Sequence, residues 1–245
     1  MLTFLGTGGA FNTERGNTSA YFELGTELFI IDAGEDVFAK LVKKNLFQGK
    51  TRVNIFVTHL HSDHAGSLGT LIAYLFIKVF NLDRSKVCVY FPSEAITEFL
   101  ALQGIKQDMY TFFINRWDEL YVDGYEKQPE YVFEPTRHTD ELNRNNETNC
   151  YGIEFSLKSD FGFFYSGDTC EFNQKLMNTY AFDYIYHEVT STEGATVHFQ
   201  YNELLALTKD MPADQKKKIT LMHLDSDFDI EKAKADGFSI AGEES

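Results

Sequence analysis

Short apolar runs separated by glycine-containing turns open the chain and predict β-strands at Leu2–Leu5, Ser19–Leu24 and Leu28–Asp32. The pattern then changes to the spacing of an amphipathic helix over Val37–Phe47, where apolar positions alternate with lysines. Val53–Val57 is an apolar, β-branched run, which is typical of a strand buried on both faces. The first quarter of the chain therefore predicts mixed α and β structure.

The alternation of strand and helix patterns continues to the C-terminal end. Further strands are expected at Lys86–Phe91, Leu120–Val122, Tyr131–Phe133, Ile153–Lys158, Gly162–Tyr165, Tyr184–His187 and Ile219–Met222. Helices are expected at Ala65–Phe80, after Pro92 from Ser93 and Glu94, and at Glu171–Tyr180, Tyr201–Lys209 and Phe228–Ala235. The strands form two groups, each followed by helices, without a linker-like break. This favours one α/β domain over residues 1–245, built as a two-sheet sandwich with helices outside.

The overall charge argues against one large class of partners. The 245 residues include 37 aspartates and glutamates against 22 lysines and arginines, a formal net charge of -15. Such a surface repels a polyanion over most of its area, so an extended nucleic-acid partner is not expected. A site that holds divalent cations would offset part of this charge locally.

No segment predicts export or membrane insertion. The start MLTFLGTGGA has no basic region and soon reaches glycine, unlike a secretory signal. The longest apolar run, Leu68–Phe80, is interrupted by Tyr74 and Lys78 and is too short to span a bilayer. The three cysteines share no CxxC spacing, which favours reduced thiols in a cytoplasmic protein.

The densest polar cluster lies in VTHLHSDHAGSL, directly after the buried run Val53–Val57. His59 and His61 are two residues apart and can project to the same side, while Asp63 and His64 follow in the turn. Neutral imidazoles suit zinc and related ions, and a mixture of histidine and aspartate suits a site that also holds water. The pattern therefore predicts a metal site in preference to a polar surface loop.

Four ligands so close together cannot complete two coordination spheres, so the remaining ligands must come from downstream. His138 in PTRHTD, Asp168 in YSGDT and His223 in TLMHLD each stand at or near the end of a predicted strand. Taken singly, the histidines would be surface or core residues and the aspartate a helix N-cap. Together with the cluster, they predict a site for two metal ions.

HLHSDH, followed in order by these three residues, resembles the metallo-β-lactamase superfamily. The resemblance implies the αββα sandwich of that superfamily, with two mixed β-sheets flanked by helices. It also implies the metal ligands: His59, His61 and His138 for one zinc ion, Asp63, His64 and His223 for the other, and Asp168 as the bridge between them. Manganese is the alternative metal. Asp32 in IIDAG matches the buried aspartate behind the site, unless it is only a turn residue before Gly34.

Three features resemble the ribonuclease Z branch, whose members process the 3′ end of tRNA. They are the opening FLGTGGAFNTERGNTSAYFE with Arg15 and Asn17, the segment YSGDT, and HEVT, which is similar to a His-Glu-Ala-Thr motif. The resemblance implies that Glu188 and His198 protonate the leaving oxygen of a phosphodiester, with Asp63 also in the catalytic set. A carboxylate that stabilises a protonated imidazole suits a general acid near neutral pH. The alternatives are a strand-end surface carboxylate and a surface histidine beside a helix.

Departures from that branch argue against tRNA as the substrate. His138 and Asp168 are so close in the sequence that the Gly-rich arm that grips tRNA has no room between them. Val189 replaces the alanine of the motif, and the usual small hydroxyl residues after His198 are absent. A compact, armless and acidic member is similar to the phage anti-Pycsar phosphodiesterases, which degrade cyclic mononucleotides to defeat bacterial defence. The resemblance implies hydrolysis of 3′,5′-cyclic mononucleotides to 5′-monophosphates by a metal-activated hydroxide.

An aromatic-rich insertion at 107–131 holds the only tryptophan of the chain, with Tyr110, Phe112, Phe113 and Tyr121 beside it. Such rings can stack on a nucleobase, or they can pack in the core or in a dimer interface. The resemblance implies a homodimer, which would allow both roles if the loop reached the pocket of a partner subunit.

Three other functions stay open on the sequence alone. The chain could be an RNA endonuclease of the ribonuclease Z type, a hydrolase of thioesters or lactones, or a non-catalytic protein that sequesters a cyclic nucleotide. A thioester or lactone hydrolase has no need of Glu188 and His198. The complete set of predicted ligands argues against a binder without catalysis.

Overall fold

The computed structural model describes residues 1–138, 150–157, 161–173 and 182–243, and the strands in these residues form two sheets. The six-stranded sheet has the order β1 (Thr3–Gly6), β2 (Ser19–Leu24), β3 (Glu27–Ile31), β4 (Arg52–Phe56), β5 (Val87–Tyr90) and β6 (Thr111–Phe113). The seven-stranded sheet has the order β13 (Ser239–Ile240), β12 (Ile219–Met222), β11 (Tyr184–Glu188), β10 (Phe161–Tyr165), β9 (Tyr151–Leu157), β8 (Glu130–Pro135) and β7 (Trp117–Glu119). Both sheets contain parallel and antiparallel pairs, so both are mixed.

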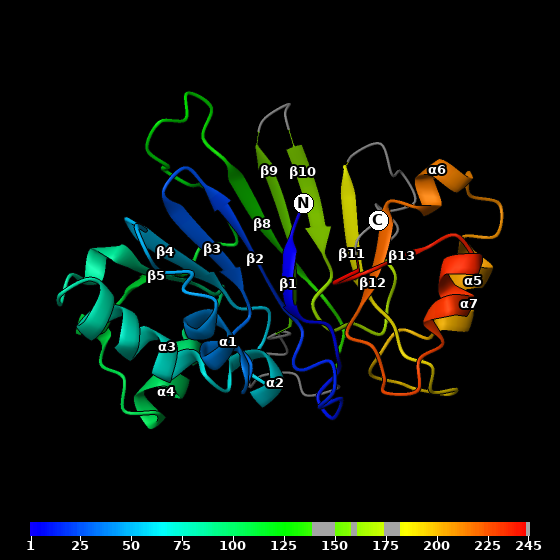
Figure 1. Ribbon diagram of the computed structural model, residues 1–245, viewed down its shortest axis with the longest axis horizontal. Coiled ribbons are helices and arrows are strands. Elements are labelled where there is room, and N and C mark those ends of the chain that lie inside the picture. Colours follow the sequence, from blue (N-terminus) through cyan, green and yellow to red (C-terminus); the bar gives the residue numbers. More distant parts are fainter. Residues whose placement is uncertain (139–149, 158–160, 174–181, 244–245) are drawn as a thin grey trace.

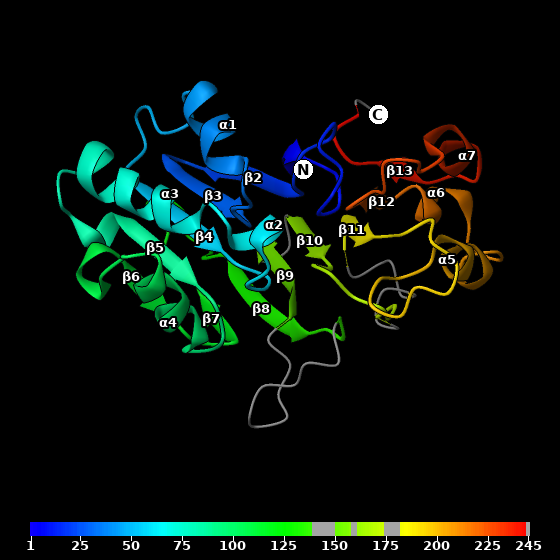
Figure 2. The same ribbon diagram turned by 90° about the horizontal axis from the view of Figure 1, so that it is seen from below.

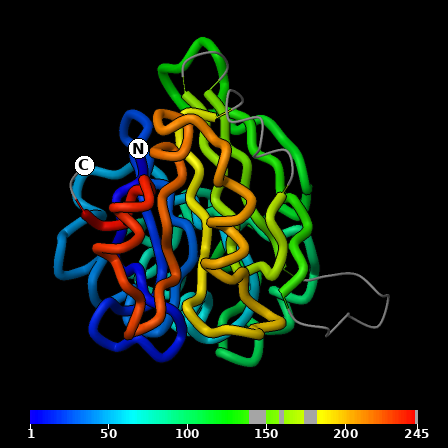
Figure 3. The backbone as a smooth tube through the Cα atoms, turned by 90° about the vertical axis from the view of Figure 1, so that its right-hand side faces the viewer, coloured from blue at the N-terminus to red at the C-terminus, as the bar shows by residue number. Residues whose placement is uncertain are grey.

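Helices cover the outer sides of the two sheets. Figures 1 and 2 show α1, α3 and α4 beside the first sheet and α5, α6 and α7 beside the second. The helices are α1 (Val37–Lys43), α2 (Ser62–Ala65), α3 (Leu68–Tyr74), α4 (Ala95–Leu102), α5 (Tyr201–Leu207), α6 (Ala213–Lys216) and α7 (Ile230–Ala235). Figure 3 shows the C-terminal part of the chain, coloured from yellow to red, on the side of the second sheet. The predicted αββα sandwich is confirmed.

The strands that precede the polar clusters run in parallel within each sheet. β3, β4 and β5 are parallel neighbours in the first sheet, and β10, β11 and β12 are parallel neighbours in the second. The two sheets meet at the carboxyl ends of these strands, where the Tyr151 amide donates a hydrogen bond to the Thr58 carbonyl oxygen (3.0 Å). Side chains that follow these strands therefore collect at one edge of the sandwich.

Stacked aromatic rings fill the space between the sheets and account for much of the high phenylalanine content. Phe22 and Phe29 of the first sheet stack at 4.8 Å, and Phe155 and Phe163 of the second stack at 5.3 Å. The Phe22 ring meets the edge of Phe155 at 4.9 Å, which joins the two pairs. Offset and edge-to-face ring pairs of this kind stabilise a core beyond the area that they bury.

Replacing Phe155 with alanine is expected to lower the free energy of unfolding by about 3–5 kcal/mol, because the change removes a buried ring at the centre of the inter-sheet core. Urea unfolding followed by circular dichroism measures the effect. Phe11→Ala is the matched control, because its ring is 97% exposed, and we expect that change to stay within about 0.5 kcal/mol. Equal losses in the two variants would contradict this description of the core.

Two predicted helices differ from the structure at one end. α1 ends at Lys43 because Asn45 adopts a left-handed φ of 55°. The helix predicted over Ala65–Phe80 is confirmed from Leu68 to Val79 but is interrupted at its start. The Ser67 amide donates to the Ala33 carbonyl oxygen (2.9 Å) instead of continuing the helix, so α2 and α3 are separate. A π-helical turn at 75–79 then follows α3.

The predicted strand Leu120–Val122 is wrong, because the strand that pairs with β8 is β7, three residues earlier. The Gln128 side chain accepts a hydrogen bond from the Val122 amide at 2.7 Å and so takes the place of a sheet partner. The short edge strands β6 and β13 were not predicted. Most of the predicted helix Glu171–Tyr180 lies outside the described residues. Within the described part of the chain, no helix combines the length and apolar character that crossing a membrane requires.

Candidate metal centre

Side chains from both sheets converge at the edge where the parallel strands end. The first sheet supplies Asp32 after β3 and His59, His61, Asp63 and His64 after β4. The second supplies His138 after β8, Asp168 after β10, Glu188 at the end of β11, His198 before α5 and His223 after β12. All are buried except the exposed His61 and the partly exposed His198. The fold therefore brings together every residue that the sequence proposed for the site.

The predicted ligands form two neighbouring groups. In each group the possible ligand atoms all lie within 4.8 Å of one another. One group offers three nitrogens, from His59, His61 and His138, and the other offers nitrogens and oxygens, from Asp63, His64, Asp168 and His223. In the first group, His138 Nε2 lies 3.3 Å from His61 Nδ1. In the second, Asp63 Oδ2 lies 3.3 Å from His64 Nε2 and 3.4 Å from His223 Nε2. Each group has the size of a coordination sphere.

Asp168 lies between the two groups and faces both of them. Its Oδ2 atom is 3.8 Å from His59 Nε2 and 3.7 Å from His138 Nε2. The same oxygen is 3.4 Å from His223 Nε2, and Oδ1 is 3.2 Å from His64 Nε2. A carboxylate in this position can contribute one oxygen to each of two ions.

The unsatisfied polar atoms of the site fit a metal centre. Within the described residues, the buried side-chain atoms that lack a hydrogen-bond partner include His59 Nε2, His64 Nε2 and Asp168 Oδ1. Leaving such atoms buried without a partner costs about 1–3 kcal/mol each. Divalent cations bound by this nitrogen and oxygen set would satisfy all three atoms, so the residues present suit zinc or a related ion.

Burial and the Asp168 carboxylate shift the pKa values of the histidines in the site. Burial lowers the pKa of His59 well below its ordinary value, which favours the neutral imidazole that binds metal. Burial also lowers the pKa of His223, but the negative charge of Asp168 and hydrogen bonds to Asp63 and Glu188 outweigh it and raise that pKa to about 10. Without a cation, a proton on this imidazole compensates the buried carboxylates, and a bound metal would take the place of that proton.

Asp32 supports the ligands from behind. Its Oδ2 atom lies 2.9 Å from His64 Nδ1, and its Oδ1 atom accepts a hydrogen bond from the Thr58 amide at 2.8 Å. Asp32 is fully buried and holds a left-handed φ of 62°. The carboxylate thereby turns His64 Nε2 toward the metal group. The sequence motif gave Asp32 but not Thr58, the residue just before His59.

Replacing Asp32 with asparagine is expected to weaken metal binding by about 10- to 100-fold, because a neutral amide orients His64 less firmly than a carboxylate does. Asparagine tolerates the left-handed backbone, so the fold should persist. Competition with a chromophoric chelator measures the affinity. Asp36→Asn, which removes an ion pair with Lys40 (2.6 Å) nearer the surface, is the matched control and should bind metal normally. Equal affinities in the two variants would contradict the supporting role.

Glu188 and His198 form a hydrogen-bonded pair beside the two groups. His198 Nδ1 lies 2.8 Å from Glu188 Oε2, and the His198 ring lies between the rings of His138 (4.9 Å) and His223 (5.1 Å). Glu188 is fully buried and accepts a hydrogen bond from the Thr169 amide at 2.5 Å. Burial lowers the pKa of His198, but its hydrogen bond to Glu188 outweighs burial, so the pKa lies above the ordinary value. This pair can hold a proton next to the metal groups.

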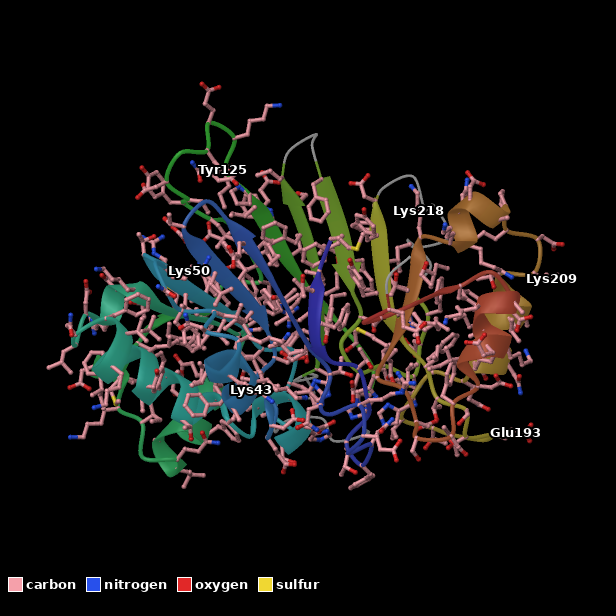
Figure 4. All side chains as sticks on the ribbon, in the orientation of Figure 1. Lys43, Lys50, Tyr125, Glu193, Lys209 and Lys218 are labelled. Atoms are coloured by element: carbon pink, nitrogen blue, oxygen red, sulfur yellow. The ribbon has the colours of Figure 1, made fainter. Side chains whose placement is uncertain are left out.

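The aromatic insertion contributes little to this edge of the sandwich. Tyr110 is buried, and Phe112 and Phe113 pack against the core. The Tyr121 carbonyl oxygen accepts a hydrogen bond from the Arg52 side chain (3.0 Å), at the start of β4 and so at the far end from the histidines that follow it. Figure 4 likewise shows Tyr125 at the top of the molecule and Glu193, which is near His198 in the sequence, at the bottom.

Other residues of the resemblance have structural contacts. The N-terminal segment packs on the site, since a Cβ built on Gly9 would lie 3.2 Å from His223 Cε1. Asn17 is buried and its Oδ1 accepts a hydrogen bond from the Asp36 amide at 3.4 Å. His187 is buried, donates through Nδ1 to the Glu188 carbonyl oxygen (2.7 Å) and stacks on Phe172, which is a structural role.

Two mixed sheets with flanking helices, and two histidine and aspartate groups sharing one carboxylate at their edge, define a metal-dependent hydrolase of the metallo-β-lactamase fold. Solved structures agree on the fold. YhfI from Bacillus subtilis, a metallo-β-lactamase fold protein, aligns with a TM-score of 0.71 over 98% of this chain and 95% of its own, at 17% identity. Human tRNase Z, short form, aligns with a TM-score of 0.65 over 98% and 95%, at 18% identity. The buried clusters are typical of the dimetal site of this fold.

The comparison of sequences identifies the family within this fold. The family model for the anti-Pycsar protein Apyc1 matches residues 1–241, and the chain belongs to this family. The anti-Pycsar protein Apyc1 of Bacillus phage vB_BveM-Goe7 is 28% identical over 248 residues, which cover 91% of this chain and 88% of that relative. The resemblance stated from the sequence motifs is thereby confirmed.

Proposed function

We propose that this chain is a phosphodiesterase that hydrolyses 3′,5′-cyclic mononucleotides to 5′-monophosphates, and that it thereby counters a cyclic-nucleotide defence of bacteria against phage. Membership of the Apyc1 family supports the substrate class. The observation that carries the reaction type is the hydrogen bond between His198 and buried Glu188 (2.8 Å) beside the dimetal groups. Hydrolysis of a carboxylic ester or thioester does not need this second proton donor.

The seven ligands have distinct places in the proposal. His59, His61 and His138 would hold one ion, Asp63, His64 and His223 the other, and Asp168 both; this nitrogen and oxygen set suits zinc, with manganese as the alternative. When bound, such a pair of ions supplies ionised water near neutral pH and positive charge beside the phosphate oxygens. The burial of six of these seven side chains keeps bulk water away from the groups that hold the phosphate.

The proton that the leaving group needs comes from His198. Glu188 holds Nδ1, so the proton for transfer sits on Nε2. As water oxygen adds to phosphorus and the bond from phosphorus to O3′ breaks, His198 Nε2 gives its proton to O3′, and the product is a 5′-monophosphate with a free 3′ hydroxyl. Glu188 favours the protonated imidazole that begins this transfer, as its effect on the His198 pKa indicates.

The test is a panel of 3′,5′-cyclic mononucleotides, cyclic dinucleotides and a pre-tRNA, each incubated with the purified protein at physiological salt, with and without a chelator. We expect 5′-monophosphates from the cyclic mononucleotides, no product after chelation, and recovery on addition of zinc. Preferential cleavage of pre-tRNA would favour the ribonuclease Z alternative. Recovery of intact cyclic nucleotide from a stable complex would favour a sequestering protein.

The biological part of the proposal has its own test. Expression of the chain in a bacterium that carries a cyclic-nucleotide defence should restore plaque formation by a phage that the defence blocks. The homodimer expected from the family is also part of the proposal, and light scattering on the purified protein measures it. A monomer that hydrolyses cyclic mononucleotides normally would remove the dimer from the proposal and leave the reaction in place.

A further inference from the structure

Two loops meet beside the metal groups, and one aspartate joins them. The first loop, Thr190–Phe199, connects β11 to α5 and carries His198; we refer to it as the acid loop. The second loop follows β12, begins with His223 and contains Asp225. His223 holds a left-handed φ of 57°, which turns the chain sharply as it leaves the strand. Asp225 belongs to none of the sequence motifs that carry the family resemblance.

A single oxygen of Asp225 binds the start of the acid loop. Its Oδ2 atom accepts hydrogen bonds from the Thr190 hydroxyl (2.7 Å), the Ser191 amide (2.7 Å) and the Ser191 hydroxyl (2.9 Å). Hydrogen bonds to a charged acceptor are stronger than those between neutral groups. Ser191 itself is exposed, so this carboxylate is a main attachment of the first turn of the loop.

The two ends of the acid loop are tied together at Thr190. Its amide donates to the Phe199 carbonyl oxygen (2.9 Å), and its carbonyl oxygen accepts from the Tyr201 amide (3.0 Å). Phe199 is the neighbour of His198 in the chain. Asp225 therefore holds Thr190, and Thr190 holds Phe199, on one side of His198; on the other side His138 Nδ1 lies 2.8 Å from the Val197 carbonyl oxygen.

We infer that Asp225 is the positioning residue for the general acid: it holds the acid loop so that His198 reaches the leaving oxygen of the substrate. The inference rests on the proposed function, because it assumes that His198 is the proton donor. The negative charge of the Asp225 side chain contributes to this attachment as well as its shape. In Asp225→Asn the oxygen that faces the three donors is neutral, and a neutral acceptor forms weaker hydrogen bonds than a carboxylate. The attachment of the loop is then weakened although the volume of the side chain is unchanged.

The test compares two substrates that differ in their need for an acid. The 3′ oxygen of a cyclic mononucleotide would leave as an alkoxide and therefore needs a proton. Bis(4-nitrophenyl) phosphate releases a stable 4-nitrophenolate, which needs none. We expect Asp225→Asn to lower kcat for the cyclic nucleotide by about 10- to 100-fold, a part of what a general acid supplies. KM, metal content and kcat for the aryl substrate should stay within about twofold of the unmodified enzyme.

Two further variants complete the design. Asp227→Asn is the matched control, because Asp227 accepts a hydrogen bond from the Ser191 hydroxyl (3.1 Å) that Asp225 also binds; this variant should behave as the unmodified enzyme. Thr190→Val removes the hydroxyl that donates to Asp225, and it should likewise lower kcat for the cyclic nucleotide but not for the aryl substrate. Combined with Asp225→Asn it should add little, because both changes break the same contact.

The outcomes separate the two proposals. An unmodified enzyme that cleaves the aryl substrate but no cyclic nucleotide refutes the proposed function, and the inference with it. An enzyme that cleaves both, with Asp225→Asn unchanged on both, refutes the inference alone. Equal losses of Asp225→Asn on both substrates, or loss of metal, also overturn it, because Asp225 then acts on the metal site or on the fold.

Discussion

Replacing Asp168 with alanine is expected to reduce hydrolysis to background and to strip the protein of bound metal. The Asp168 carboxylate faces both groups, with Oδ2 3.7 Å from His138 Nε2 and Oδ1 3.2 Å from His64 Nε2. In the proposed site Asp168 is a ligand of both ions, so its loss would remove a ligand from each ion and the charge that balances two cations in a buried site. Metal content by atomic emission, measured together with phosphodiesterase activity, tests both parts.

The control for Asp168→Ala is Asp210→Ala, which removes a carboxylate from an exposed side chain and should keep both metal and activity. Circular dichroism shows whether the Asp168 variant is folded. If the folded variant kept two ions per chain and normal turnover, Asp168 would not bridge them. Retention of one ion with loss of activity would place Asp168 on a single ion instead.

Replacing His198 with alanine is expected to lower kcat on cyclic mononucleotides by about 10²- to 10⁴-fold, the usual contribution of a general acid. Metal content should not change, because His198 lies outside the two groups of predicted ligands; it forms a separate cluster with Glu188 and His138. The aryl phosphodiester should be cleaved at nearly the normal rate, since its leaving group needs no proton. Steady-state kinetics with the two substrates and a metal assay measure these expectations.

A double-mutant cycle with Glu188→Gln sharpens this result. If Glu188 acts through His198, the two losses should not add, because each change removes the same proton transfer. Glu188 also lies 3.5 Å from His223 Nδ1, so metal content must be checked in that variant. Normal cleavage of cyclic nucleotides by His198→Ala would show that the acid is another group, and fully additive losses would separate the two residues.

Much of the site was predictable because its residues follow strands. His59 through His64 stand together after an apolar run, and His138, Asp168 and His223 each follow another strand that ends at the same edge. Parallel strands bring their carboxyl ends together, so positions at strand ends become neighbours in space even when they are far apart in sequence. Glu188 and His198 came from the family resemblance, and their contact at 2.8 Å depends on the tertiary structure.

The parts that were missed depend on contacts that a sequence pattern does not contain. Asp225 is an ordinary polar residue after His223 until the acid loop folds against it. The break between α2 and α3 arises because Ser67 bonds to the Ala33 carbonyl, which comes from another part of the chain. β13 is two residues long and pairs only at the sheet edge, so it has no periodicity to read.

The origin of the ligands in both sheets has a mechanical consequence. Four of the predicted ligands follow β4 of the first sheet, and the other three follow β8, β10 and β12 of the second sheet. Away from this edge, aromatic rings such as Phe22 and Phe155 pack the two halves of the sandwich against each other. Bound cations would therefore link the two halves, because a ligand that binds only the folded state adds its binding free energy to the stability of the whole chain. The same ions that would activate the attacking water would thus also hold together the two sheets that carry their ligands.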